Sequence, residues 1–163
     1  MARFVVVLPL VPLNAGDEFT VADWPLHVTL VEPFQAELAA SEVAAAIRRV
    51  AETAEPVRAS AGEPAMFGRR RDVPVTLVRD GGELAGLRTR TLDSLREAGI
   101  DMARLRARTD FRPHVTRKRH AHLSPGDRVV LDTVALIDMR PAEGAHHRSV
   151  VASCRLGARP VSA

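Results

Sequence analysis

Two copies of the tripeptide His-Val-Thr constrain this chain more than any other feature of its sequence. The first copy begins at His27 and the second at His114, and each follows closely on a proline, Pro25 and Pro113. The two histidines lie 87 positions apart (114 minus 27), slightly more than half of the 163 residues. This spacing predicts two copies of one structural unit that face each other across a pseudo-twofold axis.

The geometry of a β-strand gives each tripeptide a chemical meaning. Because side chains alternate between the two faces of a strand, His27 and Thr29 point to one side and the valine between them to the other. His114 and Thr116 repeat this arrangement. Two such strands across a groove would gather two imidazoles and two hydroxyls around one small volume. Imidazoles can then exchange protons at a phosphorus centre while hydroxyls hydrogen-bond its oxygens.

The remaining sequence predicts a mixture of strands and helices. We expect strands over Arg3–Leu10, Leu26–Val31 (closed by Pro33), Val57–Ser60, Pro74–Val78, His114–Arg119, Arg128–Met139 and Arg148–Leu156, the last two joined as a hairpin through a turn at 141–144. We expect helices over Ser41–Glu52, with Ser41 as N-cap, and over Glu83–Ala98, with Gly99 as C-cap.

The order of these elements predicts an α+β fold. Hairpins without a regular βαβ repeat favour largely antiparallel sheets. No Gly/Ser-rich linker divides the chain, so residues 1–163 are interpreted as one bilobal domain. Its two pseudo-symmetric sheet-and-helix lobes would surround a central cleft.

Composition excludes several classes of protein. No run of 18 apolar residues is present, which argues against a membrane span, and we expect no signal peptide. The single cysteine, Cys154, cannot form an internal disulfide and suits the cytoplasm. With 23 Lys and Arg against 20 Asp and Glu, the chain is mildly cationic. That balance suits an anionic small molecule or a nucleic-acid end better than duplex DNA, and 4% aromatic residues disfavour a platform for stacking several bases.

The two motifs resemble those of the two-histidine (2H) phosphoesterase superfamily, which includes the bacterial 2'-5' RNA ligase/RNA 2',3'-cyclic phosphodiesterase proteins. The similarity continues through the basic loop and strand at 67–77 and the helix at Glu83–Ala98, which precede the second motif in the same order. It extends over Arg3–Arg119, and over the last hairpin in outline.

The resemblance implies a bilobal fold and metal-independent chemistry on 2',3'-cyclic phosphates, with no cofactor. By position, His27 and His114 would be the acid/base pair, and Thr29 and Thr116 the phosphate ligands. The expected reaction is hydrolysis of a cyclic nucleotide or an RNA terminus. Two alternatives stay open: 2'-5' end joining by the reverse reaction, and a binding module without turnover. No membrane or obligate protein partner is expected.

Two cationic residues follow the second motif. By strand parity, Lys118 shares the side of His114 and is a candidate substrate contact. Arg117 stands where the family usually has an apolar residue, on the side that packs against a helix. We therefore expect either an exposed strand end or an arginine whose charged head extends to water.

Other candidate substrate contacts are Arg69, in a basic loop of three arginines, and the aromatic residues Phe34 and Phe67, with Trp24 as a further aromatic to test. The loop arginines are either a solvated surface or a phosphate contact.

The remaining histidines and the cysteine carry weaker signals. His120 and His122 share one parity, but no cysteine or nearby carboxylate completes a metal site, so a solvated strand end is the favoured interpretation. His146 and His147 are expected as an exposed pair after a turn, and Cys154 as a small buried hydrophobe.

Overall fold

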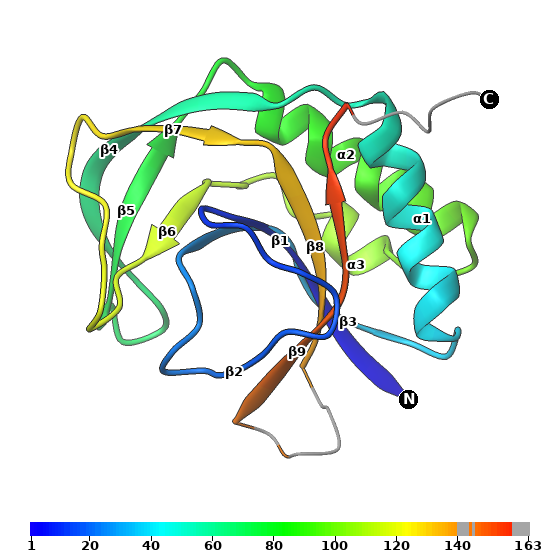
Figure 1. Cartoon of the computed structure of the whole chain (residues 1–163). Coiled ribbons are helices and arrows are strands. Elements are labelled where there is room, and N and C mark those ends of the chain that lie inside the picture. The colour runs from blue at the N-terminus through cyan, green and yellow to red at the C-terminus, as the bar shows by residue number, and fades with distance from the viewer. Residues whose placement is uncertain (140–143, 145, 158–163) are drawn as a thin grey trace.

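The computed structural model describes residues 1–139, 144 and 146–157. Within them the strands form one antiparallel sheet in the order β2-β9-β8-β1-β3-β6-β5-β4-β7. In Figure 1 the sheet is strongly curled, and the helices gather on one side of it. The elements are β1 (Ala2–Pro9), β2 (Glu18–Thr20), β3 (His27–Ala36), α1 (Ala40–Thr53), β4 (Val57–Phe67), β5 (Val73–Arg79), α2 (Glu83–Glu97), α3 (Ala103–Arg106), β6 (His114–Thr116), β7 (Arg128–Leu131), β8 (Thr133–Asp138) and β9 (His147–Arg155).

The two faces of the sheet carry separate apolar clusters. The larger cluster lies under α1 and α2, and its strand members include Phe4, Val28 and Val115. The smaller cluster lies on the opposite face, where the segment between β1 and β3 covers the sheet. Its members are Val5, Val7, Leu13, Trp24, Ala135, Ile137 and Val150. None of the helices in the described part of the chain is long and apolar enough to cross a membrane.

The centre of the sheet joins its two halves through β3 and β6. The register between these antiparallel strands consists of one pair, Val28 with Val115. The two motifs therefore lie on neighbouring strands of one continuous sheet, rather than across a groove between separate sheets. Both valines are buried in the helix-side core, as strand alternation predicts.

The predicted α+β class with antiparallel pairing is confirmed, and so is the second helix. Leu84, Leu87, Thr91 and Leu95 are its buried face. Gly99 has φ of 99°. Its N–H donates to the Arg96 carbonyl and the Ile100 N–H to the Leu95 carbonyl. These two hydrogen bonds, together with the left-handed conformation of Gly99, form a Schellman motif that ends the helix.

Two predicted boundaries were wrong for local reasons. Pro33 does not close its strand, because the ladder with β1 shifts register between Phe4 and Val6, and a proline at such a bulge breaks no ladder bond. Ser41 is not the N-cap. That position is Ala39, which makes no side-chain capping bond, and Ser41 lies within the first turn of α1.

The strands after the second motif also differ from the prediction. The strand expected over His114–Arg119 ends at Thr116, because the chain turns where the Lys118 N–H donates to the Ala121 carbonyl. The strand expected over Arg128–Met139 divides in two: β7 pairs with β4 at the edge of the sheet, whereas β8 pairs with β1 and β9. Residues 141–143 of the expected hairpin turn lie outside the described residues. The short elements β2 and α3 were not expected from the sequence.

A buried arginine ties α2 to the strand that carries the first motif. Arg88 donates to the carbonyls of Leu30 in β3, at 3.3 Å, and of Leu105 in α3, at 3.1 Å. It forms an ion pair with Glu32 at 3.1 Å. Its guanidinium also lies 5.2 Å from the ring centroid of Phe111, just upstream of the second motif. One side chain thus supports the approaches to both histidines.

Replacing this arginine should destabilise the protein. Arg88→Met leaves two carbonyls and Glu32 without their cation, and we expect a loss of about 3 kcal/mol in the free energy of unfolding. The estimate is at the lower end for a broken buried pair because Glu32 keeps 27% of its side chain exposed. Denaturant unfolding measures it. The control is Arg96→Met on the same helix, where the arginine is 56% exposed, and its loss should cost less than about 1 kcal/mol. Equal losses in the two variants would contradict this role for Arg88.

Candidate active site

Both motif histidines are held in the same way by the main chain. Nδ1 of His27 lies 2.8 Å from the Pro25 carbonyl oxygen, and Nδ1 of His114 lies 2.8 Å from that of Arg112. A carbonyl oxygen only accepts hydrogen bonds, so each Nδ1 carries a proton. In the neutral ring, Nε2 is then an unprotonated acceptor. Each carbonyl belongs to the residue two positions before its histidine.

The register of β3 and β6 brings the four polar side chains together. Counted antiparallel from the Val28–Val115 pair, His27 lies beside Thr116 and Thr29 beside His114. Such directly opposed residues have Cβ atoms about 4.5–5.5 Å apart, and diagonal ones, as the two histidines are, lie about 7–8 Å apart. All four side chains are half-buried, on the face opposite the two valines. This face, with its two imidazoles and two hydroxyls, is called the histidine face below.

Each imidazole contacts an aromatic ring, and an arginine lies near that ring in turn. Trp24 stacks on His27 with ring centroids 4.3 Å apart, and Phe67 meets His114 edge-on at 4.4 Å. Arg148 lies 5.4 Å from the centroid of Trp24, and Arg112 lies 5.1 Å from that of Phe67. The two halves thus repeat an arginine–aromatic–histidine series, although Trp24 and Phe67 come from unrelated places in the chain.

The surroundings of His27 favour its neutral form. Burial lowers its pKa from 6.5 to about 4, and the positive charges of Lys118 and His114 act in the same direction. The hydrogen bond to the Pro25 carbonyl opposes this shift in part, because it stabilises the charged ring. At neutral pH, His27 therefore presents an Nε2 lone pair to the histidine face.

The expected substrate contacts are not all brought to the histidines. The Lys118 amine lies near His27, where it donates to the Val21 carbonyl at 3.3 Å, and Phe67 contacts His114. Arg69 is exposed on the turn that connects β4 to β5. Phe34 is only 6% exposed and belongs to the core on the helix side, with its ring 6.1 Å from that of Phe4. It therefore lies on the face opposite His27.

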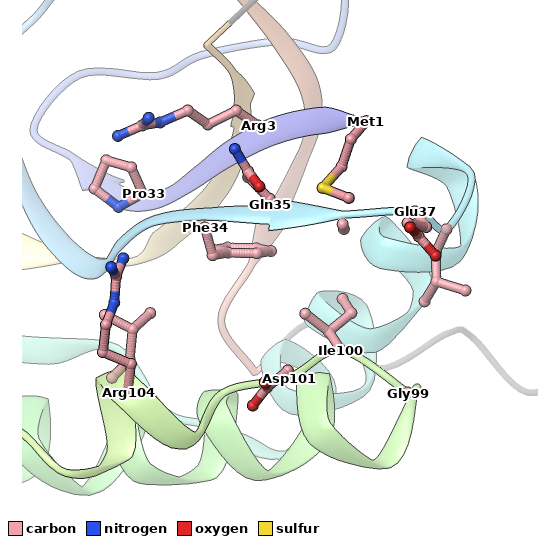
Figure 2. A pocket seen from close by; sticks show the side chains of 13 residues that line it. Met1, Arg3, Pro33, Phe34, Gln35, Glu37, Gly99, Ile100, Asp101 and Arg104 are labelled. Carbon is pink, nitrogen blue, oxygen red and sulfur yellow. The ribbon is translucent and has the colours of Figure 1, made fainter.

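Two surface cavities lie elsewhere. Phe34 lines a cavity of about 750 Å³ between the end of β3 and the segment that leads into α3. Figure 2 shows Arg104 and Ile100 across this cavity from Phe34, with Arg3 beyond the strand. A second cavity, of about 390 Å³, is lined by the strands β4 and β5 and by Arg117 and His122. Neither histidine of the motifs lines either cavity.

The remaining arginine, histidine and cysteine candidates from the sequence lie outside the two motifs. Arg117 is exposed, one of the two outcomes expected for it, and His120 and His122 are exposed as well. Within the described residues, no group of three or more His, Cys, Asp or Glu is arranged to hold a metal ion. Cys154 is buried, as predicted, and burial raises the pKa of its thiol. His147 departs from the expected exposed pair, because it begins β9 and is half-buried.

Sequence reasoning missed Arg112 and Arg148 as neighbours of the site. Arg112 had a usable signal, since it stands two residues before His114, where Pro25 stands before His27. Arg148 had none, because its approach to Trp24 depends on where β9 lies in the sheet.

We expect the low pKa of His27 to depend on Trp24, whose ring stacks on the imidazole and shields it from water. We expect the Cε1 proton of His27 to titrate with a midpoint near pH 4 by NMR in the intact protein. In Trp24→Ala, water reaches the ring, and the midpoint should rise toward 6.5. Phe67→Ala, which uncovers the other histidine, is the matched control and should leave the His27 midpoint in place. A midpoint near 6.5 in the intact protein would contradict the assigned burial.

Comparisons with known proteins identify the family and the fold of this chain. Residues 13–137 match the family model of the 2'-5' RNA ligase superfamily. Among solved structures, TT0787 of Thermus thermophilus has a TM-score of 0.66 at 18% identity, covering 98% of this chain and 100% of its own. E. coli LigT complexed with 3'-AMP has a TM-score of 0.61 at 17% identity, covering 96% and 99%.

A structure described as a phosphoesterase has a TM-score of 0.61 at 16% identity, covering 97% of this chain and 100% of its own. At these identities the likeness establishes the fold. No curated protein matches the sequence significantly. The family match extends over most of the chain and includes both motifs, so the chain belongs to the 2'-5' RNA ligase superfamily, within the two-histidine phosphoesterases.

Proposed function

We propose that this protein hydrolyses a 2',3'-cyclic phosphate on a nucleotide or RNA terminus, with His27 and His114 as the acid/base pair. The observation that carries the proposal is the matched pair of histidines on neighbouring strands. Each has Nδ1 held by a carbonyl at 2.8 Å, which leaves Nε2 available on the same face. The crystallised complex of LigT, a structural neighbour, with 3'-AMP supports a nucleotide as substrate.

The proposed reaction is one in-line displacement at phosphorus. Nε2 of His27 takes a proton from water as the water oxygen bonds to phosphorus. The bond from phosphorus to one ribose oxygen breaks, and that oxygen receives a proton from Nε2 of His114. Thr29 and Thr116 donate hydrogen bonds to the non-bridging oxygens. One proton is taken up and one released by the pair in each turnover.

The environment of His27 supports its role as the base. A general base must be unprotonated at the working pH, and burial lowers the pKa of His27 to about 4. The role of proton donor then falls to His114, whose Nδ1 is held by the Arg112 carbonyl in the same way.

Hydrolysis of adenosine 2',3'-cyclic phosphate in excess chelator tests the reaction. Losing either member of an acid/base pair should reduce kcat by about 10²–10⁴-fold, so we expect this loss in His27→Ala and in His114→Ala. His122→Ala, which removes an exposed histidine, is the control and should retain activity. Near-normal turnover in either motif variant would refute the two-histidine assignment. Product analysis with RNA ends separates hydrolysis from 2'-5' end joining, which would use the same groups in reverse.

The pH dependence of kcat/KM tests whether the lowered pKa of His27 governs the reaction on the acid side. With His27 as base, activity falls on the acid side only as the pH drops toward about 4, where its ring takes up a proton. Activity should therefore persist at pH 5. An acid limb with its midpoint near 6.5 would contradict the lowered pKa of His27 in the working enzyme. Steady-state rates from pH 7 down to about 3.5 in buffers of constant ionic strength locate this midpoint.

A further inference from the structure

We propose that Lys118 is a positioning residue for the reaction, because its amine holds the turn that carries Trp24, and Trp24 covers His27. This inference rests on the proposed function, since it gives the cover of His27 a part in catalysis. It differs from the role of substrate contact that the sequence suggests for Lys118. The chain that leaves the second motif would thereby set the surroundings of the histidine in the first.

One carbonyl oxygen connects Lys118 to Trp24. The oxygen of Val21 accepts a hydrogen bond from the Lys118 amine at 3.3 Å and another from the main-chain N–H of Trp24, also at 3.3 Å. A carbonyl oxygen has two lone pairs, so it can accept from both donors. Lys118 therefore bonds to the atom that closes the turn directly before the indole.

The rest of this turn, residues 20–24, is fixed by its own bonds and by β9. The Asp23 N–H donates to the Thr20 carbonyl at 3.1 Å, and the Thr20 hydroxyl donates to the Asp23 carboxylate at 3.0 Å. The Val21 N–H donates to the His146 carbonyl, just before β9, at 2.9 Å. These bonds set the shape of the turn and hold one side of it. Lys118 holds the carbonyl side.

The bond from Lys118 to Val21 connects distant parts of the sheet. Val21 directly follows β2, and Lys118 lies two residues beyond β6. In the sheet, the strands β9, β8, β1 and β3 lie between β2 and β6. Because the sheet is strongly curled, its two parts approach each other over the histidine face (Figure 1). The Lys118 amine is thus a tie across that face, between residues 97 positions apart in the chain.

The ring that this turn presents is in direct contact with His27. The ring centroids of Trp24 and His27 are 4.3 Å apart, with an angle of 26° between the rings. Trp24 is buried, but its indole N–H has no hydrogen-bond acceptor among the described residues. The indole is therefore held in place by packing and by its main chain, which makes the position of the turn important.

Lys118 can act on His27 in two ways. Burial lowers the pKa of His27, and the charges of Lys118 and His114 lower it further. A third cation, Arg148, lies across the indole, 5.4 Å from its centroid. The charge of Lys118 acts directly, whereas its hydrogen bond acts by keeping Trp24 over the imidazole. Only the second effect requires the tryptophan to stay in place, so the two can be separated by experiment.

Hydrogen exchange of the indole N–H tests the tie. Trp24 is the single tryptophan of the chain, so its indole gives one NMR signal. In Lys118→Met we expect exchange to be about tenfold faster, the effect of losing one hydrogen bond from a charged donor. Lys118→Arg, which keeps the charge and a donor, should restore slow exchange. Arg117→Met removes the same charge from the exposed neighbour and is the matched control, with exchange unchanged.

The titration of His27 and the activity should follow the indole. In Lys118→Met, the His27 midpoint should rise from about 4 toward 6.5, and the acid limb of kcat/KM should move with it. Both should stay in place in Lys118→Arg. Lys118→Gln is measured alongside, because its side chain is one bond shorter but still polar. It should behave as Lys118→Met does, which keeps the test available if the methionine variant does not fold.

Three results would overturn the inference. A raised His27 midpoint with unchanged indole exchange means that Lys118 acts by its charge alone. A raised KM for adenosine 2',3'-cyclic phosphate, with exchange and midpoint unchanged, means that Lys118 contacts the substrate instead. Unchanged values throughout mean that the bond to Val21 holds nothing. None of these results affects the two-histidine assignment.

The proposed function is judged separately. Indole exchange and the His27 midpoint are measured on the protein without substrate. If the intact protein hydrolyses no cyclic phosphate, the proposed function fails, and these two measurements still decide whether Lys118 positions Trp24. If hydrolysis is found and indole exchange is the same in every Lys118 variant, the proposed function stands and the positioning role is refuted.

Discussion

The pairing of Val28 with Val115 is the contact on which the site depends. It is the register that joins β3 to β6, and therefore one half of the sheet to the other. Because each valine is the middle residue of a His-Val-Thr motif, burying both under the helices turns all four polar side chains to the opposite face. A shift of one residue in this register would place one motif's histidine and threonine in the apolar core. The core and the histidine face are thus fixed by the same contact.

The two halves are alike in their main-chain geometry and different in their surroundings. Both rings donate from Nδ1 to a carbonyl two residues upstream. His27, however, is covered by a tryptophan and lies near Lys118, whereas His114 meets Phe67 at the end of β4. A duplicated unit in an unequal environment can give two identical groups different tendencies to bind a proton, and here burial lowers the pKa of His27. The division of labour proposed for the histidines follows from this inequality.

Sequence reasoning predicted the motifs, the side to which each residue points, the antiparallel α+β class and the second helix with its glycine end. Those features depend on local rules: strand alternation, helical spacing and the left-handed glycine. It failed where contacts between segments distant in the sequence determine where a strand ends and which strand it pairs with. Pro33 is tolerated because the ladder has a bulge there, and β7 pairs with β4 rather than continuing the expected hairpin. Phe34 illustrates the same limit for the site, since only the register with β1 shows that it faces the core.

Anchoring the imidazoles through main-chain oxygens has a consequence for how such a protein can diverge. Every residue has a carbonyl, so the side chain at the anchoring position is free to change without disturbing which nitrogen bears hydrogen. This chain already contains two solutions, a proline at position 25 and an arginine at position 112. Substitutions at the residue two positions before each histidine can therefore change the charge and shape beside the site without changing the tautomer of the imidazole. A fold retained at 18% identity with TT0787 is compatible with that freedom.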